Sequence, residues 1–133
     1  MGLTAVGLYM VLLGFAAIIT PGVGIAGALL GLFPQPVTEF SHVPAYGLLT
    51  WLLTSGLRRR EWPKPMALLV GIVLPMVFGL WMEVLQGFVP GRVVDIGDVA
   101  LNGLGITIAA LLIVAVDERG HSSPTVRVLG SRL

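Results

Sequence analysis

The chain has 133 residues, of which 56% are hydrophobic and only 11% charged, and its mean hydropathy is +0.94. A soluble domain carries about 25% charged residues, so the composition excludes an ordinary water-soluble globular protein. The net charge of +1 argues against nucleic-acid binding, which needs a strongly basic face, and the absence of cysteine excludes disulfides and thiolate chemistry.

Uncharged segments divide the chain into pieces long enough to cross a bilayer. Residues 1–38 carry no charge, and three later segments of 18 residues each also lack Asp, Glu, Lys and Arg. About 20 mostly apolar residues cross a bilayer as a helix, and open strands leave backbone groups unpaired in lipid. The sequence therefore predicts an all-α fold, a four-helix transmembrane bundle. The predicted spans lie near 3–20, 40–57, 66–87 and 99–116.

A short apolar segment follows the first predicted span. Residues 22–33 lie between Pro21 and Pro34 and are too few for a crossing. This length favours a re-entrant or interfacial segment, with a flexible apolar loop as the alternative. A signal peptide is the competing interpretation of residues 1–20, but the segment has no Lys or Arg before its apolar part and no small-x-small cleavage site. A retained span is therefore favoured.

Basic residues predict the orientation. Seven of the eight lie in the connection between the second and third spans or after the fourth, and the connection at 83–98 holds only Arg92. Because positively charged loops stay cytoplasmic, both termini are predicted inside and the protein is predicted to be a multi-pass protein of the cell membrane. Residues 1–116 then form the transmembrane domain, and 117–133 a polar, mobile cytoplasmic tail. The seven bases are Arg58, Arg59, Arg60, Lys64, Arg119, Arg127 and Arg132.

The polar residues that topology does not explain converge on the outer side of the membrane. Glu39, His42 and Tyr46 follow each other at spacings of three and four, so one helical face can hold all three. Carboxylates inside a membrane are costly and face protein or water rather than lipid, so Glu83 requires a partner. The candidate site residues are Glu39, His42, Tyr46, Glu83, Gln86, Arg92, Asp95, Asp98 and Asn102.

Structural roles compete with a functional one for each of these residues. Asp98 suits the N-cap of the fourth span, and Arg92 suits an ion pair with Asp95 or Asp98 across the Pro90-Gly91 turn. Gln86 and Asn102 suit hydrogen bonds between helices. The clustering favours function, because a purely structural bundle has little need of several carboxylates, a guanidinium and an imidazole together.

Two motifs carry a family resemblance. The first is Glu83-x-x-Gln86-x-x-x-Pro90-Gly91-Arg92-x-x-Asp95-x-x-Asp98-x-x-x-Asn102-x-x-Gly105, and the second is His42-x-x-x-Tyr46-x-x-Leu49. Together they resemble the VanZ-like family of small membrane proteins, over about residues 38–116. The family often has an Asp-Lys pair before the histidine segment, where this chain has Thr38-Glu39, so no role of that Lys is carried over. The resemblance implies a four-helix membrane protein, and the namesake of the family is associated with low-level resistance to the glycopeptide teicoplanin.

Three functions remain open at this stage. The first is an enzyme or binding protein that acts on a lipid-linked, phosphate-bearing molecule at the outer leaflet. Arg92 would bind the phosphate, Glu83 or His42 would act as general base or acid, and five further residues would bind the substrate. These five are Tyr46, Gln86, Asp95, Asp98 and Asn102.

The other two hypotheses need no chemistry at the site. One is a non-catalytic structural or accessory membrane protein, and the other is an ion-coupled transporter that uses Glu83. Four helices are few for a translocation path, so transport would require a homo-oligomer. The sequence leaves open whether the protein is an enzyme. It identifies no cofactor. A divalent metal held by Glu83, Asp95 and Asp98 stays open, because oxygen ligands suit Mg²⁺ or Mn²⁺, but no metal is assigned, since the three residues match no known ligand spacing.

Overall fold

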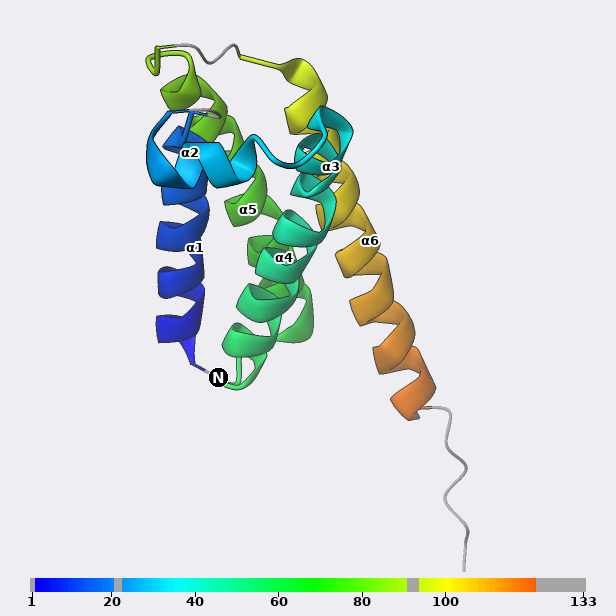
Figure 1. Ribbon diagram of the computed structural model, residues 1–133. Coiled ribbons are helices and arrows are strands. Elements are labelled where there is room, and N and C mark those ends of the chain that lie inside the picture. Colours follow the sequence, from blue (N-terminus) through cyan, green and yellow to red (C-terminus); the bar gives the residue numbers. More distant parts are fainter. Residues whose placement is uncertain (1, 21–22, 91–93, 122–133) are drawn as a thin grey trace, which may run out of the picture.

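The fold is an all-helical bundle with two short helices across one end (Figure 1). The computed structural model describes residues 2–20, 23–90 and 94–121, and these ranges contain no strand, as the sequence predicts. The helices are α1 (Leu3–Ile18), α2 (Gly24–Leu30), α3 (Gln35–Phe40), α4 (His42–Arg58), α5 (Lys64–Gln86) and α6 (Ile96–His121).

The four long helices alternate in direction, so their connections gather at two ends (Figure 1). One end holds α2, α3 and the connection from α5 to α6, and we call it the α2/α3 end. The opposite end holds the start of α1, the connection from α4 to α5 and the end of α6. We call it the α4–α5 loop end.

Prolines account for several helix boundaries. α5 begins with Lys64 and Pro65, and proline fits the first turn of a helix because the N–H that it lacks would have no partner there. Pro44 explains why the predicted second span does not begin as one continuous helix. It offers no N–H to the Phe40 carbonyl, so α3 ends at Phe40 and α4 begins at His42. The predicted span near 40–57 therefore corresponds to α4, but Glu39 lies on α3 and does not share one helix with His42 and Tyr46, contrary to the prediction from the sequence.

The four long helices lie close to the four predicted spans in the sequence, but only two of them meet the length and hydropathy expected of a membrane-crossing helix. Among the described residues, α5 and α6 are long and apolar enough to cross a membrane, judged by length and composition. α1 is apolar but has 16 residues, and α4 has 17. The last helix also continues to His121, so 117–121 are helical rather than part of a tail. The rest of the predicted tail, 122–133, lies outside the described residues.

Gly47 of α4 and Gly105 of α6 let the two helices approach more closely than residues with a Cβ atom would allow at these positions. A Cβ atom at Gly105 of α6 would overlap the backbone carbonyl oxygen of Val43 on α4. A Cβ atom at Gly47 of α4 would in turn lie 3.1 Å from the carbonyl oxygen of Gly105. Close backbone approach of this kind brings Cα–H groups against carbonyl oxygens and increases dispersion contact, which drives helix association in lipid.

A second close contact joins α4 to α5. Thr50 and Thr54 of α4 are fully buried, and Gly71 of α5 lies so close that a Cβ atom there would overlap the Thr54 hydroxyl. Neither threonine hydroxyl has a hydrogen-bond partner among the described residues. Pro75, one turn further along α5, provides no N–H for the Gly71 carbonyl. The centre of the bundle therefore combines tight packing with unpaired polar atoms.

The Gly105 contact gives a stability prediction. We expect Gly105→Ala to lower the free energy of unfolding by about 1–3 kcal/mol, because the Val43 backbone cannot rotate away from the added methyl group. Gly103→Ala, two residues away on α6, is the matched control, since its nearest neighbour is the flexible end of Met76 at 3.3 Å. The measurement is loss of helical circular dichroism during SDS titration of the protein in mild detergent. Equal stability of the two variants would contradict the assigned α4–α6 contact.

Candidate functional site

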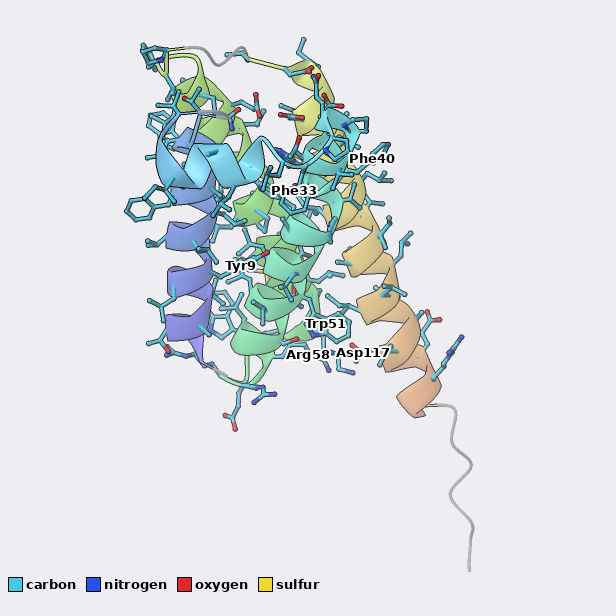
Figure 2. The ribbon with its side chains drawn as sticks, viewed as in Figure 1. Tyr9, Phe33, Phe40, Trp51, Arg58 and Asp117 are labelled. Carbon is cyan, nitrogen blue, oxygen red and sulfur yellow. The ribbon has the colours of Figure 1, made fainter. Side chains whose placement is uncertain are left out.

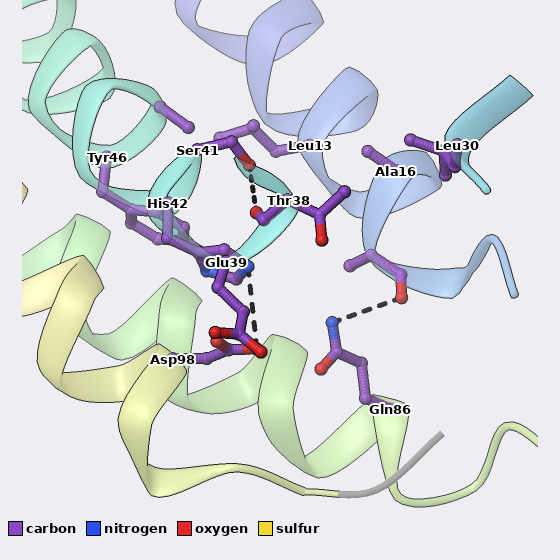
Figure 3. Close-up of a pocket in the computed structure, with 12 residues that line it drawn as sticks. Leu13, Ala16, Leu30, Thr38, Glu39, Ser41, His42, Tyr46, Gln86 and Asp98 are labelled. Carbon is purple, nitrogen blue, oxygen red and sulfur yellow. Dashed lines mark hydrogen bonds and ion pairs between the residues drawn. The ribbon is translucent and has the colours of Figure 1, made fainter. Parts of the chain in front are cut away.

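A partly open pocket of about 190 Å³ lies at the α2/α3 end (Figure 3). One wall is apolar and comes mainly from α1 and α2. Its residues are Leu13, Ala16, Ala17, Leu30 and Ala45. The opposite wall is polar and comes from α3, α4, α5 and α6. Its residues are Thr38, Glu39, Ser41, His42, Tyr46, Gln86 and Asp98.

His42 is the most constrained polar side chain of the pocket. Its Nδ1 lies 2.9 Å from Oδ1 of Asn102, and its Nε2 lies 3.7 Å from Oδ2 of Asp98. The ring also stacks on Tyr46, with the centroids 6.3 Å apart and the planes 9° from parallel. An amide oxygen only accepts hydrogen bonds, so Nδ1 of His42 carries the proton. Nε2 is therefore the nitrogen that can take up or release a proton beside Asp98.

Gly79 makes room for this arrangement. Asn102 is only 1% exposed, and a Cβ atom at Gly79 would lie 2.8 Å from its Nδ2 and 3.0 Å from the Tyr46 ring. Any larger residue at this position would displace Asn102 or Tyr46, both of which contact His42. The family motifs name Asn102 and Tyr46, but the glycine that seats both of them lies outside those motifs.

Glu83 and Gln86 fix the end of α5, and both are only 4% exposed. Oε2 of Glu83 accepts a hydrogen bond from the Asp95 backbone N–H at 3.2 Å, which anchors the segment before α6. Nε2 of Gln86 donates to the Ala17 carbonyl at 3.2 Å, which joins α5 to the end of α1. Gln86 lines the pocket, whereas Glu83 is not among the residues that line it.

The structure brings most of the predicted site residues together, by routes that differ in part from the prediction. His42, Tyr46, Gln86 and Asp98 line one pocket, and Asn102 supports His42 from behind. Glu39 reaches the same pocket from α3, on a separate helix from His42, because of the break before Pro44.

Asp95, and not Asp98 as the structural alternative suggests, caps the start of α6. Asp95 is exposed, and its Oδ1 accepts a hydrogen bond from the Gly97 N–H at 2.7 Å, so it caps the start of α6. Asp98 lies in the first turn of α6 and faces the pocket. Arg92, the predicted phosphate ligand, lies outside the described residues.

Sequence reasoning missed the apolar wall and two hydroxyl residues. Leu13, Ala16 and Ala17 belong to a helix with no polar signal near the site, and Leu30 comes from a segment with no assigned role. Thr38 and Ser41 flank Glu39 and His42, and this adjacency was the one available clue.

No metal centre is evident in the described part of the chain. Within it, no three His, Asp or Glu side chains are placed to share a metal ion. Glu83 and Asp95 do approach each other, but the contact uses the Asp95 backbone N–H, while the Asp95 carboxylate faces Gly97.

An ion pair closes the other end of the bundle. Arg58 donates from one guanidinium nitrogen to both carboxylate oxygens of Asp117 at 2.7 Å, and Lys64 lies 3.9 Å from the same carboxylate (Figure 2). Arg58 therefore joins α4 to α6 in addition to any part it plays in topology. This contact and the His42 contacts hold the same two helices at opposite ends.

A comparison with protein families matches residues 26–117 to the family described as VanZ/LLP1. The chain belongs to this family. The matched region covers more than half of the chain and includes every polar residue of the pocket, while the apolar wall from α1 of this VanZ/LLP1 protein lies before it. No curated protein and no solved structure matches the chain.

The His42–Asn102 contact predicts a defined tautomer. In ¹⁵N NMR of the micellar protein with neutral imidazole, we expect His42 to carry its proton on Nδ1. The chain has two histidines, so His121→Gln leaves one signal to assign.

Three variants test the source of this preference. Asn102→Leu should release His42 to a mixture of tautomers. Gly79→Ala should do the same through the crowded Asn102, whereas Gly14→Ala, with Met82 at 3.8 Å, should not. A proton on Nε2 in the unsubstituted protein would overturn the assignment.

Proposed function

We propose that this VanZ/LLP1 protein crosses the cell membrane four times and binds the polar head of a lipid-linked envelope molecule in the pocket. The observation that carries the proposal is the division of the pocket into a polar and an apolar wall. A ligand with a polar head and an apolar chain fits such a division, because each part meets a wall of its own kind. The two walls also enclose an open volume of about 190 Å³ instead of packing against each other, which favours ligand binding over a purely structural role.

The surface of the bundle supports membrane insertion of all four long helices. Large apolar side chains face outward on each of them, with Leu8 of α1 73%, Leu48 of α4 46%, Trp81 of α5 58% and Leu111 of α6 65% exposed. At about 1.5 Å per residue, α1 and α4 are each roughly 25 Å long, close to the hydrocarbon thickness of about 30 Å. Exposed apolar surface on this scale is stable in lipid and not in water.

The two ends of the bundle differ in a way that supports an orientation. Arg58, Arg59, Arg60 and Lys64 gather at the α4–α5 loop end, which we place in the cytoplasm. The pocket then opens at the outer leaflet. α2 lies across that end with Ile25 86% exposed, as an interfacial helix would (Figure 1).

His42 gives the pocket a route to proton transfer. Nε2 faces Asp98 while Nδ1 is held by Asn102, so the imidazole has a fixed orientation and one reactive nitrogen. A general base needs this kind of placement within reach of a bound hydroxyl or amine. Catalysis on the bound molecule is therefore the second candidate function. Binding or modification of an envelope component is consistent with the link of the VanZ namesake to teicoplanin resistance.

Cysteine labelling tests the orientation, because the chain has no native cysteine. We expect Thr38→Cys, at the pocket, to react with a membrane-impermeant maleimide on intact cells. Glu61→Cys, in the α4–α5 connection, should react only after the membrane is permeabilised. The reverse pattern would place the pocket in the cytoplasm.

Native mass spectrometry tests ligand binding. We expect the protein extracted in mild detergent to retain an amphiphile, and Ala16→Phe to lose it because the new ring fills the apolar wall. Gly7→Phe on the same helix is the matched control, since no atom lies within 4 Å of a Cβ atom at Gly7. If the amphiphile stays bound to the Ala16→Phe variant, the pocket is not its binding site.

A further inference from the structure

We propose that a second pocket, at the α4–α5 loop end, binds an anionic phospholipid of the adjoining leaflet. This pocket has a volume of about 150 Å³ and lies between the end of α4, the start of α5 and the last part of α6. We call it the loop-end pocket. The inference goes beyond the proposed function, because it concerns another site and assumes only that the long helices cross a membrane.

The residues that line the loop-end pocket form two layers. α4 and α6 run toward this end of the bundle and α5 runs away from it (Figure 1). Each helix contributes one residue to an outer layer and another four positions deeper, which is about 6 Å along a helix. The outer layer consists of Arg58, Lys64 and Asp117. The deeper layer consists of Thr54, Leu68 and Ile113. Charged groups therefore precede mainly apolar ones, in the same order as the head and chains of a phospholipid.

The outer layer retains hydrogen-bond donors for a phosphate. Arg58 uses only Nη1 for its two bonds to Asp117, so its Nε and Nη2 make no hydrogen bond within the described part of the chain. Nζ of Lys64 lies 3.9 Å from the Asp117 carboxylate, too far for a hydrogen bond. Asp117 and Glu118 also line the pocket, and each already interacts with other groups of the chain. A guanidinium and an ammonium in one pocket can together bind phosphate oxygens.

Thr54 provides an independent observation. It lines the loop-end pocket and is 0% exposed, and its hydroxyl has no hydrogen-bond partner among the described residues. Thr107, by contrast, satisfies its hydroxyl by donating to the carbonyl of Gly103, four residues earlier, at 2.8 Å. The ester carbonyls of a phospholipid lie just below its phosphate, so a phosphate at the outer layer brings one of them to the level of Thr54. Pairing this buried hydroxyl favours binding of the lipid.

The surroundings of the pocket favour an anionic lipid. The connection at 58–64 holds four bases and one acid, and Arg59 and Arg60 are exposed. Basic pockets between transmembrane helices bind anionic lipid heads. Val114 lines the pocket beside Ile113 and is 40% exposed, so a lipid chain can pass from the pocket to the bilayer.

Native mass spectrometry of the full chain in mild detergent tests the site. The probes are dilauroyl phosphatidylglycerol and dilauroyl phosphatidylcholine, which share chains and phosphate and differ in net charge. We expect the phosphatidylglycerol to bind at least about fivefold more tightly. Lys64→Gln should weaken its binding about tenfold, whereas Arg60→Gln, which removes the same charge from the same connection, should weaken it by no more than about twofold. Thr54→Val should weaken it about threefold, whereas Thr50→Val, which removes an equally buried hydroxyl outside the pocket, should not.

The outcomes separate this site from general attraction of charge and from the pocket at the α2/α3 end. Equal binding of the two lipids, equal weakening by Lys64→Gln and Arg60→Gln, or equal effects of the two threonine variants overturns the inference. Glycerol phosphate that displaces the lipid at equal concentration shows a site for free phosphate, and this also overturns it. Ala16→Phe should leave the binding unchanged. Loss of binding in that variant would place the lipid in the pocket at the α2/α3 end, which overturns this inference and supports the proposed function.

Discussion

The close approach of α4 and α6 is the constraint on which the site depends. Gly105 brings its Cα against the Val43 carbonyl, only one residue from His42 along α4. At this separation His42 can contact Asn102 and Asp98 at once, and both of these residues lie on α6. A helix pair held at the usual distance of 8–10 Å by larger side chains would place the imidazole out of reach of one partner or the other. The pocket chemistry is therefore a consequence of a backbone contact between small residues.

One face of α4 extends this constraint along the whole bundle. His42, Tyr46, Thr50, Thr54 and Arg58 recur at every fourth position, so they share a face that points into the protein. Both ends of this face make hydrogen bonds to α6, whereas the two threonines in the middle are buried without partners. In lipid, apolar burial gives little drive for helix association, and the free energy must come from such contacts and from dispersion. The unpaired hydroxyls cost free energy, and the close packing of Gly71 on Thr54 offsets it through dispersion and Cα–H contact.

The placement of the helices and of the polar residues was predictable because charge is so scarce in the chain. Glu83 and Asp98 stand at the ends of uncharged segments, and consecutive helices in a bundle run antiparallel, so those ends had to meet. Contacts between residues distant in sequence were not predictable. The pair of Arg58 with Asp117 spans 59 positions, and each residue also fits a simpler role at a helix end. That Asp95 rather than Asp98 caps α6 was not predictable for another reason: both residues lie near the start of the helix, and only backbone geometry decides which one caps it.

The apolar wall was not predicted because it has no polar or charged side chain, yet under the proposed function it bears on how a ligand would enter the pocket. The polar wall is fixed to backbone at several points, including the Gln86 contact with Ala17 and the Thr38 contact with Gln35. α2 is fixed far less: it packs least of the six helices against the rest of the bundle, and Ile25 and Leu29 face outward. Segments with few buried contacts open at the lowest free-energy cost. For the amphiphile of the proposed function, the route of lowest cost therefore lies past Leu30 of α2, on the side where the surface is apolar, which would leave its chain beside lipid while its head meets the polar wall.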